Sequence, residues 1–482
     1  MIESEKMLKK IRRIRLFDES GLDRDAITSL RLMIIAVAFG VVQFNVVTGI
    51  AMAGYLRELG LSDFLFGLMY AIGPLFAPLQ LFASYVLEIT RARKTIFLVS
   101  GIVQRLLWIP FGLVPFFVPM EFFTLRIWIV ALFLLVSATV SPFLNVSFFS
   151  MAADIVPERI RGRYFAARSR ISTVLAILAG FTVAYLLDTL EGFNSYAVVF
   201  AIAGVCGTLD ILCFIGVKPP PMPVLSKAGG SFKSILKGVF SNKRYMRFIL
   251  FMTLWMFSIN FSGPFILVHL REGVALNATL TTLAVQILPN ICSVIVLAKW
   301  GGMLDKYGNK AVMRAAVGLH IFAPFLWIFT SNNSISIFFI MFIGAASGFL
   351  IPAFDLGANN IMLGNAPKEN RSMYFAMYFM LTAIIGAGLA NAMGGWMLDN
   401  IFIYPEALEL KIFGSPLTRY NFILAASAVM RFLLVFVAMP RLVEDAESIK
   451  PMEVIKQTAR DVKRVWNARI VVTKLYFKRA RK

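Results

Sequence analysis

Twelve long apolar runs recur along the chain, and they constrain its fold more than any other feature. A helix that crosses a lipid bilayer needs about 20 predominantly apolar residues. Hydrophobic residues make up 59% of the chain and charged residues only 16%, so a water-soluble globule could not bury the apolar surface. We therefore predict an all-α membrane protein with twelve transmembrane helices, near 32–56, 63–87, 95–117, 126–151, 165–187, 196–217, 246–270, 276–299, 311–330, 335–361, 373–398 and 420–439.

A stretch rich in Pro, Gly and Lys at 218–245 separates the first six runs from the last six, as is typical of a cytoplasmic linker. We expect two six-helix bundles at 32–217 and 246–440, with a basic arm at 1–31 and a basic tail at 441–482. Apolar residues at helical spacing among Lys and Arg in both extensions favour interfacial helices on anionic inner-leaflet lipids. The alternative is that the tail is solvated and unstructured.

Basic residues concentrate on one side of the predicted spans. With both termini inside, 41 of the 48 Lys and Arg residues fall in cytoplasmic segments and 5 fall outside. This asymmetry orients a multi-pass protein of the cytoplasmic (inner) membrane. It also accounts for the net charge of +21, so no nucleic-acid partner is expected. We expect a monomer whose partners are membrane lipids and a small-molecule substrate.

The two halves of the chain repeat. The triplet Leu-Arg-Glu at 56–58 recurs at 270–272, an offset of 214 residues, and Gly49 has the same offset from Gly263. Changes of offset fall in predicted loops, as a duplicated bundle requires. Further matched pairs are Asp188 with Asp399 and Tyr196 with Tyr420. The repeat predicts two pseudo-symmetric bundles.

A loop with a recognisable motif follows the eighth run. Residues 301–310 read Gly-Gly-Met-Leu-Asp-Lys-Tyr-Gly-Asn-Lys. This segment resembles the signature loop G-x-L-x-D-R-x-G-R-K that stands between spans 8 and 9 in the major facilitator superfamily. The matching positions are Gly301, Asp305, Lys306, Gly308 and Lys310, and a degraded copy with Glu88 and Arg91 follows the second run. The resemblance implies two bundles around a central cavity that opens alternately to each side of the membrane.

The resemblance also implies contacts between the bundles. In that family span 8 packs on span 5, and span 2 packs on span 11. Asp305 would then lie near Arg161 and Arg163, and Glu88 near Arg371, whenever the cytoplasmic side is closed. A carboxylate beside a helix N-terminus is favourable, so these contacts would stabilise the outward-open state. The alternative is that the charges are ordinary positive-inside anchors.

Polar side chains inside the predicted spans are candidates for substrate binding, because polar groups in a bilayer are costly and usually face the protein interior. By resemblance, spans 1, 4, 7 and 10 line the cavity. The candidates are Asn45, Asn145, Trp255, Asn260, Gln286, Asp355, Asn359 and Asn360. The amides can hydrogen-bond a polar solute, or they can serve as helix-packing groups.

Charged residues within the spans carry two further predictions. Asp355 is the only acid in the middle of a predicted cavity-lining span, which makes it a candidate proton carrier. Alternatively, it is a structural aspartate bonded to Asn359 or Asn360. Arg105 and Asp210 lie at similar depth in spans 3 and 6, which predicts a structural ion pair.

Enzymatic motifs are missing from the sequence. There is no C-x-x-C, no H-E-x-x-H, no G-x-x-x-x-G-K-[ST] and no G-x-S-x-G, so we expect no metal, no cofactor and no enzyme activity. We predict a secondary active transporter of a small organic solute, with proton-coupled uptake of a polar solute such as a sugar. The alternatives are proton-driven efflux of amphipathic compounds and a transport-inactive receptor or platform protein.

Overall fold

The computed structural model describes residues 22–220, 240–365, 371–412 and 415–441. Within these ranges twelve helical segments are long and apolar enough to cross a membrane, which confirms the predicted span count. They are Arg24–Glu58, Asp63–Thr90, Arg93–Phe117, Met120–Ile155, Arg159–Thr189, Gly192–Gly216, Lys243–Gly273, Ala278–Tyr307, Asn309–Phe329, Ser336–Asn365, Tyr374–Asn400 and Arg419–Arg441.

The described residues of the first half form nine α-helices and two short 3₁₀ turns. The helices are α2 (Arg24–Thr48), α3 (Ile50–Glu58), α4 (Asp63–Leu75), α5 (Leu79–Thr90), α6 (Arg93–Leu106), α7 (Trp108–Phe117), α8 (Phe123–Ile155), α9 (Glu158–Thr189) and α10 (Gly192–Cys213). The turns are η1 (Met120–Phe122) and η2 (Phe214–Gly216).

The second half repeats this plan with more interruptions. Its α-helices are α12 (Lys243–Asn260), α13 (Gly263–Val268), α14 (Ala278–Thr282), α15 (Leu288–Tyr307), α16 (Asn309–His320), α17 (Phe322–Phe325), α18 (Ser336–Asn365), α19 (Arg371–Ala383), α20 (Ala390–Asn400), α21 (Ile403–Ala407) and α22 (Arg419–Leu433). The π-helical turns are η3 (His269–Gly273), η4 (Leu283–Ile287), η6 (Ile384–Leu389) and η7 (Leu434–Ala438), and the 3₁₀ turns are η5 (Leu326–Phe329) and η8 (Met439–Arg441). A two-residue hairpin pairs β1 (Lys411–Ile412) antiparallel with β2 (Ser415–Pro416).

Spans 1 and 7 are each broken near the repeat-matched glycines. Between α2 and α3, Gly49 adopts an extended backbone with φ −100° and ψ −157°. In span 7, α12 ends at Asn260 and α13 begins at Gly263, with a proline in its first turn. Proline is tolerated there because a first-turn N–H has no helical partner. The breaks create two short half-helices, α3 and α13, that lead to the same end of the molecule.

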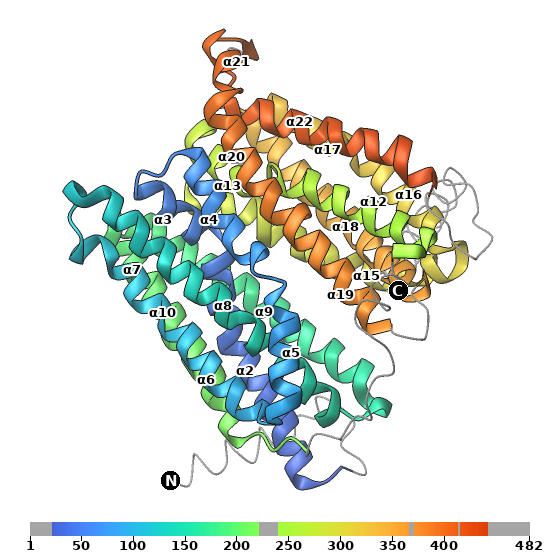
Figure 1. Ribbon diagram of the computed structural model, residues 1–482. Coiled ribbons are helices and arrows are strands. Elements are labelled where there is room, and N and C mark those ends of the chain that lie inside the picture. The colour runs from blue at the N-terminus through green and yellow to red at the C-terminus, as the bar shows by residue number, and fades with distance from the viewer. Residues whose placement is uncertain (1–21, 221–239, 366–370, 413–414, 442–482) are drawn as a thin grey trace, which may run out of the picture.

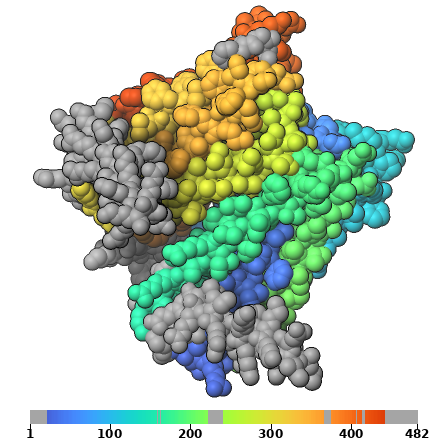
Figure 2. Space-filling view, turned by 180° about the vertical axis from the view of Figure 1, so that it is seen from behind, coloured from blue at the N-terminus to red at the C-terminus, as the bar shows by residue number. Residues whose placement is uncertain are grey.

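The two halves meet at one end and separate toward the other. Figure 1 shows them in contact around α3, α4, α13 and α20, and diverging toward the start of α2 at the bottom and α16 at the right. Seen from behind, green segments of the first half lie along yellow segments of the second in Figure 2, in agreement with the packing of α9 on α14. We call the first region the closed end, and the opposite region, where α5 ends and α16 begins, the open end.

The apolar cores follow the same division. One cluster of buried side chains at the closed end draws on both halves, and Phe66 of α4 packs on Phe265 of α13 with ring centroids 5.5 Å apart. Farther from this end the cores are separate: Tyr164 belongs to a cluster of the first half and Trp255 to a cluster of the second. Burial of apolar area, worth about 25 cal/mol per Å², therefore joins the halves at the closed end.

The first and seventh spans each begin inside a segment that was predicted to lie outside the bundles. Helix α2 begins at Arg24, so part of the predicted arm belongs to the first span. Asp25 in its first turn suits the positive helix N-terminus. Helix α12 begins at Lys243, inside the predicted linker, and the Asn242 side chain accepts a hydrogen bond from Tyr245 N at 3.0 Å. The proposed interfacial helices of the arm and tail, at 1–21 and 442–482, lie outside the described residues.

Candidate gate and solute cavities

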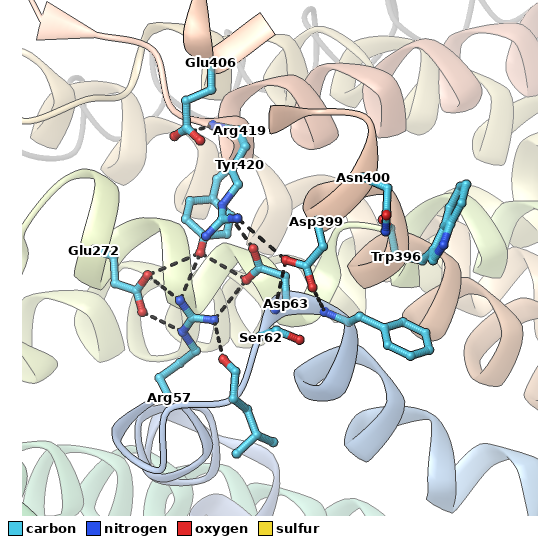
Figure 3. Close-up of polar contacts among 12 residues, drawn as sticks. Arg57, Ser62, Asp63, Glu272, Trp396, Asp399, Asn400, Glu406, Arg419 and Tyr420 are labelled. Atoms are coloured by element: carbon cyan, nitrogen blue, oxygen red, sulfur yellow. Dashed lines mark hydrogen bonds and ion pairs between the residues drawn. The ribbon is translucent and has the colours of Figure 1, made fainter. Parts of the chain in front are cut away.

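A charged network joins the two halves at the closed end (Figure 3). Arg57 of α3 donates to both carboxylate oxygens of Glu272, with Nε–Oε1 and Nη2–Oε2 distances of 2.7 and 2.8 Å. Its Nη1 lies 3.0 Å from Asp63 Oδ1, and Arg419 Nε lies 3.1 Å from Asp63 Oδ2. The Tyr420 hydroxyl bridges Asp63 and Glu272 at 3.1 and 3.2 Å. Asp63 is fully buried, and its two arginines come from opposite halves.

Two aspartates reinforce this end by capping helices of the opposite half. Asp188, at the end of α9, accepts from the first two backbone N–H groups of α14 at 2.7 and 2.8 Å. Asp399, at the end of α20, accepts from the first two N–H groups of α4 at 3.3 and 2.8 Å. The N–H groups of a first helical turn have no partner within the helix, and they favour a negative charge. The repeat-matched pair of aspartates therefore ties the halves together twice.

Sequence analysis did not predict this network. The signal that could have found it is the repeat, because the matched triplets at 56–58 and 270–272 place Arg and Glu at the same end of both halves. Which arginine meets which carboxylate depends on how the halves dock.

Two of the cavities between the helices contain predicted substrate-binding residues. The smaller, about 400 Å³, is bordered by α2, α9, η4 and α15, and the larger, about 540 Å³, by spans 1, 2, 3, 4, 7 and 11. Thr48, beside the break in span 1, lines both. Polar residues of the smaller cavity include Asn45, Ser172, Thr173, Gln286 and Asn290. Those of the larger include Tyr70, Gln80, Gln104, Ser137, Asn145, Asn260 and Asn391.

Four predicted substrate-binding residues line these cavities. Asn145 and Asn260 face the larger one, and Asn45 and Gln286 face the smaller one. Gln286 Nε2 donates to Asn45 Oδ1, a hydrogen bond between the halves. Gly180 of α9 makes room for it, because a Cβ atom there would lie 2.7 Å from Gln286 Nε2.

The other four predicted binding residues line neither cavity. Trp255 is 1% exposed and packs on Phe354 with ring centroids 4.7 Å apart. It therefore lies on the face of α12 that is turned toward the core. Asn360 donates to Asn309 Oδ1 at 2.8 Å, which ties α18 to the start of α16. Asp355 and Asn359 are exposed, and the role of Asp355 as a proton carrier stays a prediction.

Two hydrogen bonds of the signature loop, from Lys310 to Pro440 and between Asn309 and Asn360, lie within the second half. Gly308 has φ +82°, a conformation that favours glycine, and Lys310 Nζ donates to a backbone carbonyl in η8 at 3.0 Å. In the described part of the chain no ion pair links Asp305 to Arg161 or Arg163. This fits the open end, since those contacts are expected only where it closes. The side chain of Arg371 lies outside the described residues.

The predicted pair of Arg105 and Asp210 is brought together, with Arg105 Nη2 3.2 Å from Asp210 Oδ2. Two glycines leave the space for it. A Cβ atom at Gly207 would lie 2.6 Å from Arg105 Cδ, and one at Gly40 would lie 2.8 Å from Asp210 Oδ2. Close helix packing therefore positions both charges inside the first half.

Comparison with known proteins agrees with this architecture. The sequence profile described as Major Facilitator Superfamily matches residues 32–390 and 285–478. The chain belongs to the major facilitator superfamily. Its twelve described spans accordingly form the two pseudo-symmetric six-helix bundles of that fold. A comparison with curated protein sequences finds no match.

Solved structures of other facilitator-superfamily proteins share the fold at low sequence identity. A D-xylose-proton symporter is 13% identical with a TM-score of 0.65, over 88% of this chain and 100% of the other. A bacterial homologue of the human lysosomal transporter Spinster, inward-facing and unoccupied, is 14% identical with a TM-score of 0.64, over 89% and 100%. The nucleoside transporter NupG is 14% identical with a TM-score of 0.61, over 87% and 99%.

Proposed function

We propose that this facilitator-superfamily protein is a secondary active transporter that moves a small organic solute by alternating access, and that the structure is its inward-open state. The single observation that carries the proposal is the asymmetry between the two ends. Charges and a shared core join the halves at the closed end, whereas the cores are separate toward the open end. The closed end then faces the periplasm, and the open end, with the basic loops, faces the cytoplasm.

The solute is uncharged and polar. In the described part of the chain, neither cavity is lined by Asp, Glu, Lys, Arg or His. A charged solute would remain without a counter-charge there, and burying an unpaired charge is costly. Amide and hydroxyl side chains offer both donors and acceptors, which suits a hydroxylated molecule. The titles of two structural neighbours, a D-xylose-proton symporter and a nucleoside transporter, are consistent with this class.

Transport is proton-coupled uptake in this proposal. Asp210 and Asp355 are the carboxylates that lie well within described spans, away from both ends, so either can carry the proton. No nucleotide-binding loop is present to couple transport to ATP. The protein acts as a monomer in the inner membrane, with both termini in the cytoplasm and in contact with anionic lipids.

Flux into proteoliposomes tests the function. Labelled D-xylose, uridine and the amphipathic cation tetraphenylphosphonium serve as probes, with and without an inward proton gradient. We expect gradient-dependent uptake of an uncharged hydroxylated probe, and at least a tenfold lower rate in Asn145→Ala. The matched control Asn194→Ala alters an exposed asparagine that lines neither cavity and leaves the rate unchanged. Movement of tetraphenylphosphonium alone supports efflux instead, and no flux of any probe supports a receptor.

A further inference from the structure

A chain of hydrogen bonds connects the wall of the larger cavity to a carboxylate inside the first half. Ser137 and Gln104 both line this cavity. Gln104 Nε2 donates to Ser137 Oγ at 3.2 Å, and Gln104 Oε1 accepts from Arg105 Nη1 at 3.0 Å. The other terminal nitrogen of Arg105 lies 3.2 Å from Asp210 Oδ2. Arg105 therefore contacts the cavity wall and the carboxylate at the same time.

The ion pair lies in a tightly packed, mostly buried place. The side chains of Arg105 and Asp210 are 15% and 14% exposed. Arg105 Nη1 also donates to Gln43 Oε1 of α2. The backbone of Gly40 and Gly207 packs closely against the pair. The side chains of Arg105 and Asp210 therefore have little room to move apart. A change of charge at Asp210 therefore acts directly on Arg105.

The titratable groups around Asp210 lie on three helices. Arg105 of α6 pairs with it directly, Arg168 of α9 interacts with it electrostatically, and Cys213 lies one turn along α10 itself. Helix α2 contributes only Gly40 at the closest approach. Two arginines face one carboxylate, so when Asp210 is protonated both guanidinium groups lose their acidic partner. A buried charge without an ion-pair partner is costly unless it donates hydrogen bonds to other acceptors. Arg105 already donates one to Gln104 Oε1.

We propose that Asp210 is the proton-binding group of this transporter and that Arg105 and Gln104 link its protonation to solute binding at Ser137. This rests on the proposed function. A proton from the aqueous phase adds to a carboxylate oxygen of Asp210 and leaves it by the reverse step. Protonation releases Arg105 from the ion pair, which strengthens its bond to Gln104 and turns the amide and Ser137 toward a solute hydroxyl. Coupling is reciprocal, so the solute changes proton affinity by the same factor as the proton changes solute affinity.

Asp355 is the matched comparison. It is also an aspartate within a span, yet it lines neither cavity and has no side-chain hydrogen bond to a cavity residue in the described part of the chain. The hydrogen bonds to the cavity wall thus favour Asp210 over Asp355, although the sequence predicted Asp355 as the proton carrier and Asp210 as a partner in a structural ion pair.

Infrared difference spectroscopy over a range of pH, on the full chain in lipid bilayers, tests the proposal without any solute. The wild type should show a carboxylic-acid band that appears as pH falls. Asp210→Asn should lose this band and Asp355→Asn should keep it. If Asp210→Asn does not fold, the double variant Arg105→Gln, Asp210→Asn, which leaves neither partner of the pair charged, replaces it. A band that is lost only in Asp355→Asn, or in neither variant, overturns the proposal.

The link to the cavity has its own test. Gln104→Leu should shift the pH midpoint of the Asp210 band by about one pH unit, which corresponds to a tenfold change in proton affinity. Gln80→Leu is the control, because Gln80 lines the same cavity and its side chain has no bond to Arg105. Equal midpoints in wild type and Gln104→Leu overturn the link.

Proteoliposome uptake separates the proposal from the proposed function. For whichever of labelled D-xylose and uridine the wild type accumulates, Arg105→Gln, Asp210→Asn should lose gradient-driven accumulation and keep counterflow exchange. A purely structural ion pair predicts wild-type accumulation in the double variant, and that result overturns the proposal. If the wild type moves no probe while the infrared results hold, the proposed function fails and Asp210 remains the titrating group.

Discussion

Arg57 and Glu272 form a two-point ion pair between the halves of the chain, with nitrogen–oxygen distances of 2.7 and 2.8 Å. Paired charge-assisted bonds of this kind are strong and geometrically specific. The pair lies at the closed end, beside the buried Asp63 and the Tyr420 hydroxyl. It exists only while the halves are docked there, so in the proposed transport cycle it would stabilise the inward-open state over the outward-open state.

Removing the charge of Glu272 should therefore favour opening of the closed end. Arg57 and Glu272 are 20% and 40% exposed, so solvent screening limits the loss from Glu272→Gln to about 1 kcal/mol. Electron–electron distance measurements between spin labels at 191 and 407, both exposed at this end, should show a larger open population. Glu58→Gln removes a neighbouring exposed carboxylate that is outside this ion pair and should leave the distances unchanged. Unchanged distances in Glu272→Gln would contradict a gating role.

The capping aspartates give a second prediction. Asp188→Ala and Asp399→Ala each remove the acceptor for two N–H groups of the opposite half. Loss of an N-terminal cap costs about 1 kcal/mol, so each variant should open the closed end to a similar degree. Their effects should be alike because the two positions are repeat-matched. The same spin-label distances measure this. The control is Glu121→Gln, which changes an exposed acid in η1 at the start of the fourth span. A response to one substitution only would argue against equivalent roles.

The fold follows from the sequence because span number depends on the length of apolar runs, which needs no knowledge of packing. The breaks in spans 1 and 7 lie at Gly49 and just before Gly263, which the repeat matches, but no break was predicted there. Lining residues are harder to predict, because each residue turns the side-chain direction by about 100° around a helix of 3.6 residues per turn. Trp255 illustrates this: it lies on a span expected to line the cavity, yet it packs into the core.

The charged network at the closed end could not be predicted from the sequence, for a different reason. The ion pairs Arg57–Glu272 and Arg419–Asp63, which join the halves, connect residues more than 200 positions apart, and they form only when the halves are docked at this end. For the signature loop, the motif predicted contacts that the structure does not contain among its described residues, because they belong to the end that is open here. A sequence motif can therefore point to residues such as Asp305 that are expected to form contacts. It does not show which conformational state a structure represents.

Gly180 provides a third prediction, on the contact between Asn45 and Gln286. A methyl group at position 180 would lie 2.7 Å from Gln286 Nε2, so Gly180→Ala should displace this side chain and break its bond to Asn45. We expect at least a fivefold slower uptake in proteoliposomes at equal protein level. Gly318→Ala is the control, because nothing lies within 4 Å of the added methyl group. The double variant Gly180→Ala, Gln286→Ala should recover the lost packing but not the hydrogen bond, and full recovery of uptake would show that the bond is dispensable.

The fourth prediction concerns Asp305 and the open end. If the halves rock, Asp305 approaches Arg163 when this end closes, and cysteines at the two positions come within disulfide range, a Cα–Cα distance of about 5–7 Å. The variant Asp305→Cys, Arg163→Cys, in a background in which Cys206, Cys213 and Cys292 are serine, should cross-link slowly on mild oxidation. Adding Glu272→Gln should speed cross-linking about fivefold, because 1 kcal/mol taken from the closed end shifts the equilibrium toward closure of the open end. Adding Glu58→Gln should not change the rate. Gel mobility measures the product, and cross-linking that does not respond to Glu272→Gln would show that the two ends do not alternate.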